Sequence, residues 1–370
     1  MTSDTRSQLT DSATPGSSPA RPSFCMINYN GEAVLREALG AAMRQAHLFC
    51  EMLLVDNGSS DGSVALVERE FPAVRVVRLP ENGGAGAARN AGFREARSDL
   101  ILCLDNDVAV AEGCLEQLVE ALERNPGAVV AMPAVVYAHR REVIQYAGAG
   151  SHYLGLMTLH QQDRPLAAAD RTVRKVASVV TCAFLVDRLR LGDAAPFDEA
   201  FFYQMEDHDF GVRLRARGLE VLAVPGAVVF HGKGTEGMSI RQTGDYSSAR
   251  VYYLIRNRWL FLLKNYGGRT LLVLAPMLLV YETVQLAMVL KKGWTAEWAR
   301  AGRWILGHRR QIAAERRRVQ GLRALPDRTL LENGPVPFRD ELARGRLERL
   351  GRRALDAMAT AYWKGAVRLL

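Results

Sequence analysis

Residues 100–107 read Leu-Ile-Leu-Cys-Leu-Asp-Asn-Asp, five apolar residues followed by two carboxylates that are separated by one residue. The apolar run predicts a strand that is buried on both faces, as in the parallel sheets of α/β proteins. Side chains at the carboxyl end of such a strand face the crevice in which open α/β sheets bind ligands. Because side chains alternate along a strand, Asp105 and Asp107 can address one nucleotide and one hard cation together. The alternative is a solvated turn that caps a helix starting near Glu112.

Short apolar runs alternate with longer amphipathic stretches on both sides of this strand, beginning at Ser23. This alternation predicts an α/β domain with a Rossmann-like, mostly parallel central sheet that is flanked by helices on both faces. The expected strands are 24–29, 52–56, 74–79, 100–104 and 129–134. The expected helices are 33–46, 63–69, 85–97 and 115–124.

Residues 135–175 lose this regularity, and we expect them to form an excursion over the active-site face. The remaining part of the domain is expected to contain an apolar run at 176–186, a loop with Pro196, a helix at 206–217, and strands at 221–224 and 228–230.

Asp56 marks a second acidic strand end, because it follows the apolar residues 52–55 and opens a polar loop at 56–63. A carboxylate there could accept hydrogen bonds from a nucleobase N–H or a ribose hydroxyl. The alternative for Asp56 is an Asx turn, and Asp61 fits best as the cap of the next helix.

Residues 81–92 form a stretch of small residues that opens a helix, and their backbone N–H groups could approach a diphosphate. Arg89 in this stretch could reach the phosphates or support the loop. A glycine-rich loop is weak evidence by itself. It follows the third expected strand rather than the first, which argues against a dinucleotide-binding fold.

Three acids, Glu206, Asp207 and Asp209, open the helix that we expect from residue 206. Acids in the first turn of a helix are stabilised by the helix dipole. This structural role alone can explain the presence of at least one of the three acids. Only one or two of these side chains can enter the crevice. His231 follows the expected strand 228–230 and could complete a metal site with Asp107, although a lone histidine is more often structural.

The charge is distributed unevenly along the 370 residues, which carry a net charge of +8. Residues 1–249 contain 24 Lys and Arg against 31 Asp and Glu, whereas residues 250–370 contain 24 against 9. The basic part therefore predicts an anionic partner, either a membrane surface or nucleic acid. We do not expect nucleic acid, because the basic residues are mixed with a long apolar run and no nucleic-acid-binding motif is visible.

That apolar run is residues 270–290, of which 16 of 21 are apolar, and this length is sufficient to span a bilayer. Glu282 and Gln285 near its middle and the kink expected at Pro276 disfavour spanning. The flanking lysines and arginines are typical of helices that lie in a membrane interface. We therefore expect peripheral contact, with a spanning helix and a soluble packing helix as alternatives.

Five widely spaced cysteines and no Cys-x-x-Cys pair argue against a disulfide framework or a structural zinc site. Residues 1–22 are rich in Ser, Thr, Pro and Asp and predict a disordered tail without a secretory signal. The expected location is the cytoplasm, peripherally on the inner face of the cell membrane.

In combination, these motifs resemble glycosyltransferase family 2, inverting enzymes with the GT-A fold, and especially its bacterial rhamnosyltransferase-like members. The resemblance runs from about Ser23 to Tyr266. It implies a catalytic domain at 23–245 and leaves a basic, helical, membrane-associated region at 246–370. The matching positions are Tyr29-Asn30, 56–63, 82–92, Asp105-Asn106-Asp107, Glu206-Asp207, His231 and Arg256-Asn257-Arg258.

The resemblance also implies residue roles. It implies a catalytic base at Asp207 and an acceptor-orienting role for Glu206. It implies Mg²⁺ or Mn²⁺ held by Asp107 with Asp105 and His231. The donor-binding residues that it implies are Tyr29, Asn30, Asp56, Gly84, Arg89, Asp105 and Asn106.

The implied reaction moves a sugar from dTDP-rhamnose or a UDP-sugar to a hydroxyl of a glycan in cell-surface polysaccharide synthesis. The basic, apolar C-terminal segment fits an acceptor on a membrane lipid, such as a polyprenyl-linked glycan. The alternatives are a nucleotidyltransferase or dinucleotide-dependent oxidoreductase on the same sheet, and a noncatalytic membrane-associated scaffold.

Overall fold

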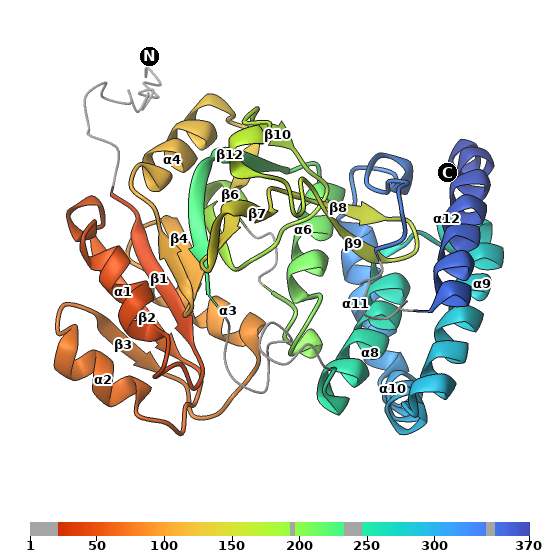
Figure 1. Ribbon diagram of the computed structural model, residues 1–370, viewed down its shortest axis with the longest axis horizontal. Coiled ribbons are helices and arrows are strands. Elements are labelled where there is room, and N and C mark those ends of the chain that lie inside the picture. The colour runs from red at the N-terminus through yellow and green to blue at the C-terminus, as the bar shows by residue number, and fades with distance from the viewer. Residues whose placement is uncertain (1–20, 193–196, 233–245, 338–344) are drawn as a thin grey trace, which may run out of the picture.

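The computed structural model describes residues 21–192, 197–232, 246–337 and 345–370. The expected tail at 1–22 falls almost wholly outside these ranges, as do Pro196 and the expected domain end at residue 245. Within them the chain forms a curled central sheet that is covered by helices and followed by a layer of C-terminal helices (Figure 1).

The sheet has ten strands in the order β10-β12-β6-β11-β4-β1-β2-β3, with β5 added to β12 and β7 added to β6; β8 and β9 pair separately. The strands are β1 Ser23–Asn28, β2 Glu51–Asp56, β3 Arg75–Arg78, β4 Leu100–Asp105, β5 Val108–Val110, β6 Ala128–Tyr137, β7 Arg140–Tyr146, β8 Ala149–His152, β9 Leu156–Leu159, β10 Arg174–Lys175, β11 Ala183–Asp187 and β12 Glu220–His231. The helices are α1 Leu35–Met43, α2 Ser63–Glu70, α3 Ala85–Glu95, α4 Cys114–Arg124, α5 Arg188–Leu191, α6 Glu206–Ala216, α8 Ser248–Asn265, α9 Gly268–Lys292, α10 Thr295–Gly307, α11 Arg309–Gly321 and α12 Arg346–Ala366.

The predicted α/β fold is confirmed, and strands β3, β2, β1 and β4 run parallel as expected. Strand β11 is antiparallel to both of its neighbours, β4 and β6, so the sheet is mixed beyond β4. The reason is the path of the chain. The excursion that follows β6 starts where the parallel strands end and returns to that same end of the sheet. Strand β11 therefore enters from that end and runs in the opposite direction.

Two details of the predicted elements were wrong. Residues 135–175 are not irregular, because they contain β7, β8, β9 and β10. The two strands expected at 221–224 and 228–230 are one strand, β12, with a register shift between Val224 and Val228. Pro225 explains this bulge, since proline has no N–H group to donate to a neighbouring strand.

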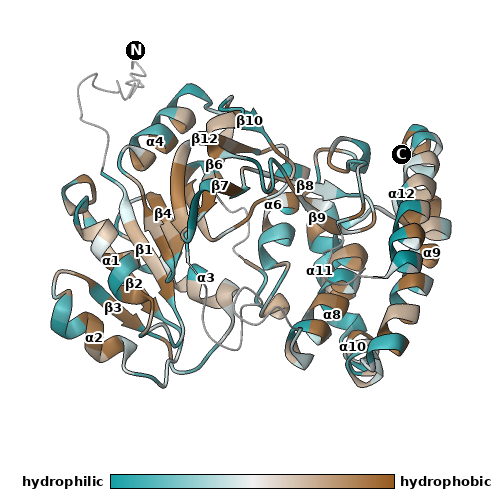
Figure 2. Cartoon of the chain, viewed as in Figure 1, coloured by the Kyte–Doolittle hydropathy of each residue, from teal (hydrophilic) through white to brown (hydrophobic). Residues whose placement is uncertain are grey.

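Alternate residues of the strands pack into separate layers, as period-2 side-chain geometry requires. Phe24 and Met26 lie in the layer that contains α1 and α4, whereas Cys25 lies in the layer that contains α3 and α6. Figure 2 shows hydrophobic residues along the strands and polar residues on outer helix faces such as those of α2 and α4. The sheet is therefore buried on both faces.

Helix α3 packs closely on the sheet at positions where its residues carry no side chain. A Cβ added at Gly92 would be 2.4 Å from the Sγ atom of Cys25. At the other end, Gly84 has φ +88°, and a Cβ there would be 2.3 Å from the carbonyl oxygen of Phe202. Gly92 thus lets α3 pack against β1, and Gly84 lets the start of α3 pack against the segment that precedes α6.

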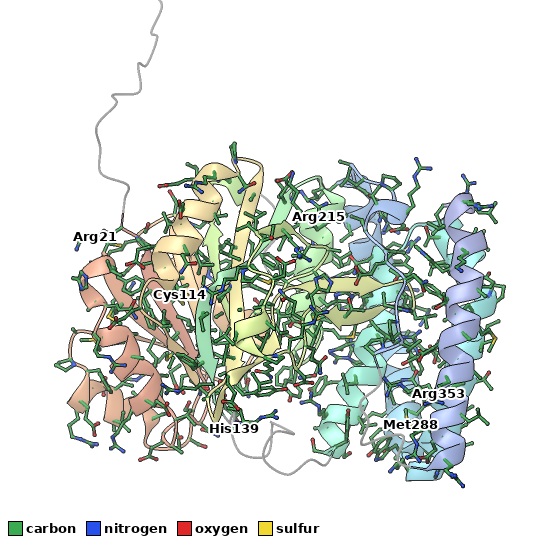
Figure 3. All side chains as sticks on the ribbon, turned by 45° about the horizontal axis from the view of Figure 1, so that its top comes forward. Arg21, Cys114, His139, Arg215, Met288 and Arg353 are labelled. Carbon is green, nitrogen blue, oxygen red and sulfur yellow. The ribbon has the colours of Figure 1, made fainter. Side chains whose placement is uncertain are left out.

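The C-terminal helices are joined to the α/β part by a buried ionic network. Lys264 on α8 is fully buried, and its Nζ lies 2.8 Å from Oδ1 of Asp209 on α6. The Nε atom of Arg213 lies 2.7 Å from Oδ2 of the same carboxylate. Burial opposes the charge of Asp209, but the two cations lower its pKa to about 2. The helical layer, in which Figure 3 labels Met288 and Arg353, therefore packs directly on the helix that carries the predicted catalytic acids.

Candidate active site

The order of the strands reverses between β1 and β4, because β2 and β3 lie on one side and the later strands on the other. In open α/β sheets this switch point is where ligands bind. A cavity of about 420 Å³ lies at the carboxyl ends of these strands, and we call it the central cavity. Its lining includes Tyr29, Gly84, Arg89, Asp105, Asn106, Asp107, Glu206, Asp207 and His231.

Arg89 on α3 connects two of the predicted acidic sites. Its side chain is only 3% exposed, and its Nη2 lies 2.7 Å from Oδ1 of Asp105 at the end of β4. Its Nη1 donates to Oε1 of Glu206, 3.2 Å away at the start of α6. Burial disfavours the charge of Arg89, but the two carboxylates raise its pKa above the usual range. Arg89 thus holds Asp105 and Glu206 together in the wall of the cavity, and its donor-binding role remains a prediction.

Asp107 and His231 also come together, as predicted for a metal site. The Nε2 atom of His231 lies 3.4 Å from Oδ1 of Asp107, and both residues are buried in the lining of the central cavity. The Nδ1 atom of His231 lies 2.8 Å from Oε1 of Gln145. With Nδ1 held by Gln145, the Nε2 edge of the ring faces Asp107.

Asp105 does not join this pair, and the described residues contain no group of three or more His, Cys, Asp or Glu that could hold a metal ion. One carboxylate and one imidazole nevertheless fit Mg²⁺ or Mn²⁺, since such ions commonly take their other ligands from water and substrate phosphates. Of the predicted metal ligands the structure brings Asp107 and His231 into contact, and the metal-binding roles of Asp105, Asp107 and His231 remain predictions.

Glu206 and Asp207 open α6 at the edge of the central cavity. Glu206 is buried, and its Oε2 has no hydrogen-bond partner among the described residues. Burial raises the pKa of the Glu206 carboxyl, and the charge of Arg89 opposes that rise. Burial, followed by the neighbouring Glu206, raises the pKa of Asp207 to about 8, although its side chain is partly open to the cavity. Both carboxyls therefore have the perturbed proton affinity that is common at catalytic sites.

The segment before α6 is held in an unusual backbone conformation. Phe202, Gln204 and Met205 have φ of 60°, 70° and 68°, a region that non-glycine residues rarely occupy. The Nδ2 atom of Asn257 on α8 donates to the carbonyl oxygens of Phe201, Tyr203 and Gln204. Asn257, the middle residue of the Arg-Asn-Arg motif, thus fixes the strained turn that presents Glu206 and Asp207.

Asp56 lies outside the lining of the central cavity. Its Oδ1 accepts a hydrogen bond from Nδ2 of Asn28 at 2.9 Å, and its Oδ2 accepts one from the backbone N–H of Ser59 at 3.1 Å. Asn30 is also outside the lining, and its Oδ1 accepts from the backbone N–H of Ser60. The structure therefore places Asp56 and Asn30 in a hydrogen-bonded turn beside the cavity, and their donor-binding roles remain predictions.

Two asparagines that sequence reasoning did not single out are important here. Asn28 links Asp56 to the cavity, since its Oδ1 accepts from Nδ2 of Asn106 at 2.9 Å. Asn57 donates to the carbonyl oxygen of Gly84 at 3.1 Å and so supports the small-residue loop. Both lie at or next to a strand end, and Asn57 also belongs to the matching segment 56–63, so these positions were the available sequence signals.

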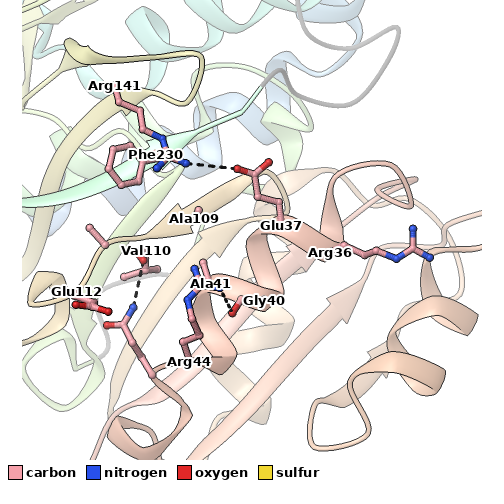
Figure 4. A pocket seen from close by; sticks show the side chains of 12 residues that line it. Arg36, Glu37, Gly40, Ala41, Arg44, Ala109, Val110, Glu112, Arg141 and Phe230 are labelled. Atoms are coloured by element: carbon pink, nitrogen blue, oxygen red, sulfur yellow. Dashed lines mark hydrogen bonds and ion pairs between the residues drawn. The ribbon is translucent and has the colours of Figure 1, made fainter.

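A separate cavity of about 410 Å³ lies between α1 and the β5–β12 pair (Figure 4). Its charged side chains include Arg44 and the pair Arg141 and Glu37, whose closest atoms are 4.0 Å apart. None of the predicted site residues lines it. The central cavity is therefore the candidate active site.

Comparison with known proteins identifies the family of the chain. Residues 23–174 match the model of glycosyl transferase family 2, and residues 100–344 match that of glycosyl transferase family group 2. The N-acetylglucosaminyl-diphospho-decaprenol L-rhamnosyltransferase of Mycobacterium tuberculosis is 27% identical over 242 residues, which cover 59% of this chain and 76% of that protein. YwdF of Bacillus subtilis, an uncharacterized glycosyltransferase, is 28% identical over 238 residues, which cover 63% of this chain and 81% of that protein.

The crystal structure of GalNAc-T7 with UDP, GalNAc and Mn²⁺ has a similar fold, with a TM-score of 0.55 and 16% sequence identity. The similarity covers 68% of this chain and about half, 49%, of that one. The second family match alone spans more than half of the sequence. The chain therefore belongs to glycosyltransferase family 2 and is a glycosyltransferase of the GT-A fold.

Proposed function

We propose that this glycosyltransferase moves a sugar, with inversion, from a nucleoside-diphosphate donor to a hydroxyl of a glycan or lipid-linked glycan. The observation that carries the proposal is the arrangement around Arg89. Its guanidinium holds the β4 carboxylate Asp105 and the α6 carboxylate Glu206 at one cavity, so acids from both elements address the same bound molecule.

dTDP-rhamnose or a UDP-sugar is the proposed donor. The Mycobacterium tuberculosis relative is named a rhamnosyltransferase, and the GalNAc-T7 structure contains UDP. Tyr29, Gly84 and Asn106 line the central cavity and would contact the nucleotide and diphosphate. Asp107 and His231 would hold Mg²⁺ or Mn²⁺ against the donor. A divalent cation there stabilises the charge that develops on the leaving diphosphate.

Asp207 is the proposed base. It would remove the proton from the acceptor hydroxyl as that oxygen attacks the anomeric carbon from the face opposite the diphosphate. Glu206 would orient the acceptor, since its Oε2 has no hydrogen-bond partner among the described residues. An acceptor hydroxyl bonded to Oε2 would satisfy this buried atom.

Replacing Asp107 tests the donor and metal site. We expect calorimetric titration to detect Mn²⁺-dependent binding of UDP or dTDP to the wild type. Asp107→Ala should weaken that binding by at least about tenfold, because it removes the charged ligand of the cation. Glu37→Ala, which changes the cavity of Figure 4, should bind like the wild type. Equal nucleotide affinity in the wild type and Asp107→Ala would contradict the assignment.

The pH dependence of transfer tests the base. Asp207 must be deprotonated to act, and its pKa is raised to about 8. The kcat/KM of the wild type should therefore rise with pH and level off above about pH 8. Asp207→Asn should retain nucleotide affinity but lower kcat by about 10²–10⁴-fold. Activity in Asp207→Asn close to that of the wild type would rule out this base and favour a noncatalytic role for Asp207.

Peripheral binding to the cytoplasmic face of a membrane is part of the proposal. Helix α9 is the one helix among the described residues that is long and apolar enough to cross a membrane. One face of α9 packs on the protein through Leu274, Met277 and Tyr281. Leu272 and Leu279 on the other face are 79% and 67% exposed. This two-sided pattern, with the basic residues around it, supports a helix lying in the interface.

Vesicle binding tests this surface. The full chain should sediment with vesicles of phosphatidylglycerol and phosphatidylcholine, and less so at high salt because the lipid charge is screened. The double variant Leu272→Glu, Leu279→Glu should bind at least about tenfold more weakly, since it removes two side chains from the apolar phase. Leu189→Glu changes an equally exposed leucine, 77%, in the α/β part and should have no effect. Unchanged sedimentation of the double variant would refute the surface.

A further inference from the structure

A third cavity of about 350 Å³ lies where α8 and α9 meet the start of α6, and we call it the helix pocket. It shares residues with the central cavity, including Gln204, Glu206, Asp207 and Arg250. Residues of α9 line the helix pocket but not the central cavity. The proposed base therefore stands at the junction of two cavities.

The walls of the helix pocket are mainly apolar. The apolar and aromatic residues that line it include Leu156, Leu254, Ile255, Tyr281, Met288 and Trp294. A wall of this kind suits a hydrocarbon chain, because burying methylene groups there removes them from water. A free sugar offers no such groups in quantity, so the wall indicates an acceptor with an apolar part.

Two buried polar atoms interrupt the apolar lining. The Nη2 atom of Arg258 and the Oε1 atom of Gln285 have no hydrogen-bond partner among the described residues. Arg258 is 2% exposed; its Nε donates to the carbonyl oxygen of Leu154 at 2.8 Å, and its Nη1 pairs with Glu282. Arg250 adds a second guanidinium to the lining. An anionic oxygen in the pocket would satisfy the N–H groups that Arg258 Nη2 leaves unpaired.

We propose that the helix pocket is the acceptor site and that it binds a prenyl diphosphate carrier, with the diphosphate at Arg258 and Arg250 and the first part of the chain along α9. This inference rests on the proposed function. The sugar joined to that diphosphate would reach Asp207, which both cavities share. One pocket thus matches the three chemical parts of a lipid-linked glycan: an apolar chain, an anionic linker and a hydroxyl-bearing sugar.

The test uses farnesyl diphosphate as the probe, with the full chain kept in saturating Mn²⁺ and UDP or dTDP so that the central cavity is occupied. Met288→Trp fills the pocket from α9, and Leu254→Trp fills it from α8. Each should weaken farnesyl diphosphate binding by about tenfold or more, because the methylene groups of the farnesyl chain are displaced and no longer buried. Ala287→Trp places the same side chain one residue along α9, at an exposed position, and should bind like the wild type. Thermal unfolding of each variant close to that of the wild type shows that the fold is kept.

Unchanged farnesyl diphosphate affinity in both pocket-filling variants would overturn the proposal. Inorganic diphosphate binding as tightly as farnesyl diphosphate would overturn it too, because the chain would then contribute nothing. Nucleotide affinity should be the same in all variants. If the wild type binds no nucleotide, the proposed function fails, whereas the farnesyl diphosphate results still decide whether the helix pocket takes a prenyl chain.

Discussion

The site depends on one buried cation, Arg89. An unpaired guanidinium inside a protein is strongly destabilising, so Arg89 requires both of its carboxylate partners. Those partners come from elements far apart in the chain, Asp105 on β4 and Glu206 on α6. The small residues of α3 allow Arg89 to approach, since a Cβ at Gly92 would collide with Cys25. Close packing of α3 on the sheet is therefore a precondition for bringing the two acidic sites together.

The C-terminal helices are part of the same machinery. Asn257 on α8 fixes the positive-φ turn before α6, and Lys264 on the same helix pairs with Asp209 inside α6. Backbone strain of this kind persists only where surrounding contacts determine it. Helix α8, which lines the helix pocket, thus also orients Glu206 and Asp207. Under the proposed function, one helix would therefore serve both the acceptor pocket and the position of the base.

Much of the fold and of the site was predictable from local patterns. Strands such as β4 are short apolar runs that end in acids. Because the carboxyl ends of parallel strands meet at one end of the sheet, it could be predicted that Asp105, Asp107 and His231 line one cavity. The antiparallel entry of β11 had no local signal, because it depends on where a 45-residue excursion returns. The contacts that Asn28 makes with Asp56 and Asn106, and those of Asn257, depend on partners 28 to 78 residues away. Periodicity and motif spacing do not encode such pairings.

The central claim is a single displacement at the central cavity, with the base on the face opposite the leaving diphosphate. The most direct measurement is the anomeric configuration of the product by nuclear magnetic resonance. It uses the dTDP- or UDP-sugar and the prenyl-diphosphate-linked glycan that the enzyme accepts. The account predicts a glycosidic bond of the configuration opposite to that of the donor. A product that retains the donor configuration would contradict it, because Asp207 would then not act as the base of a direct attack.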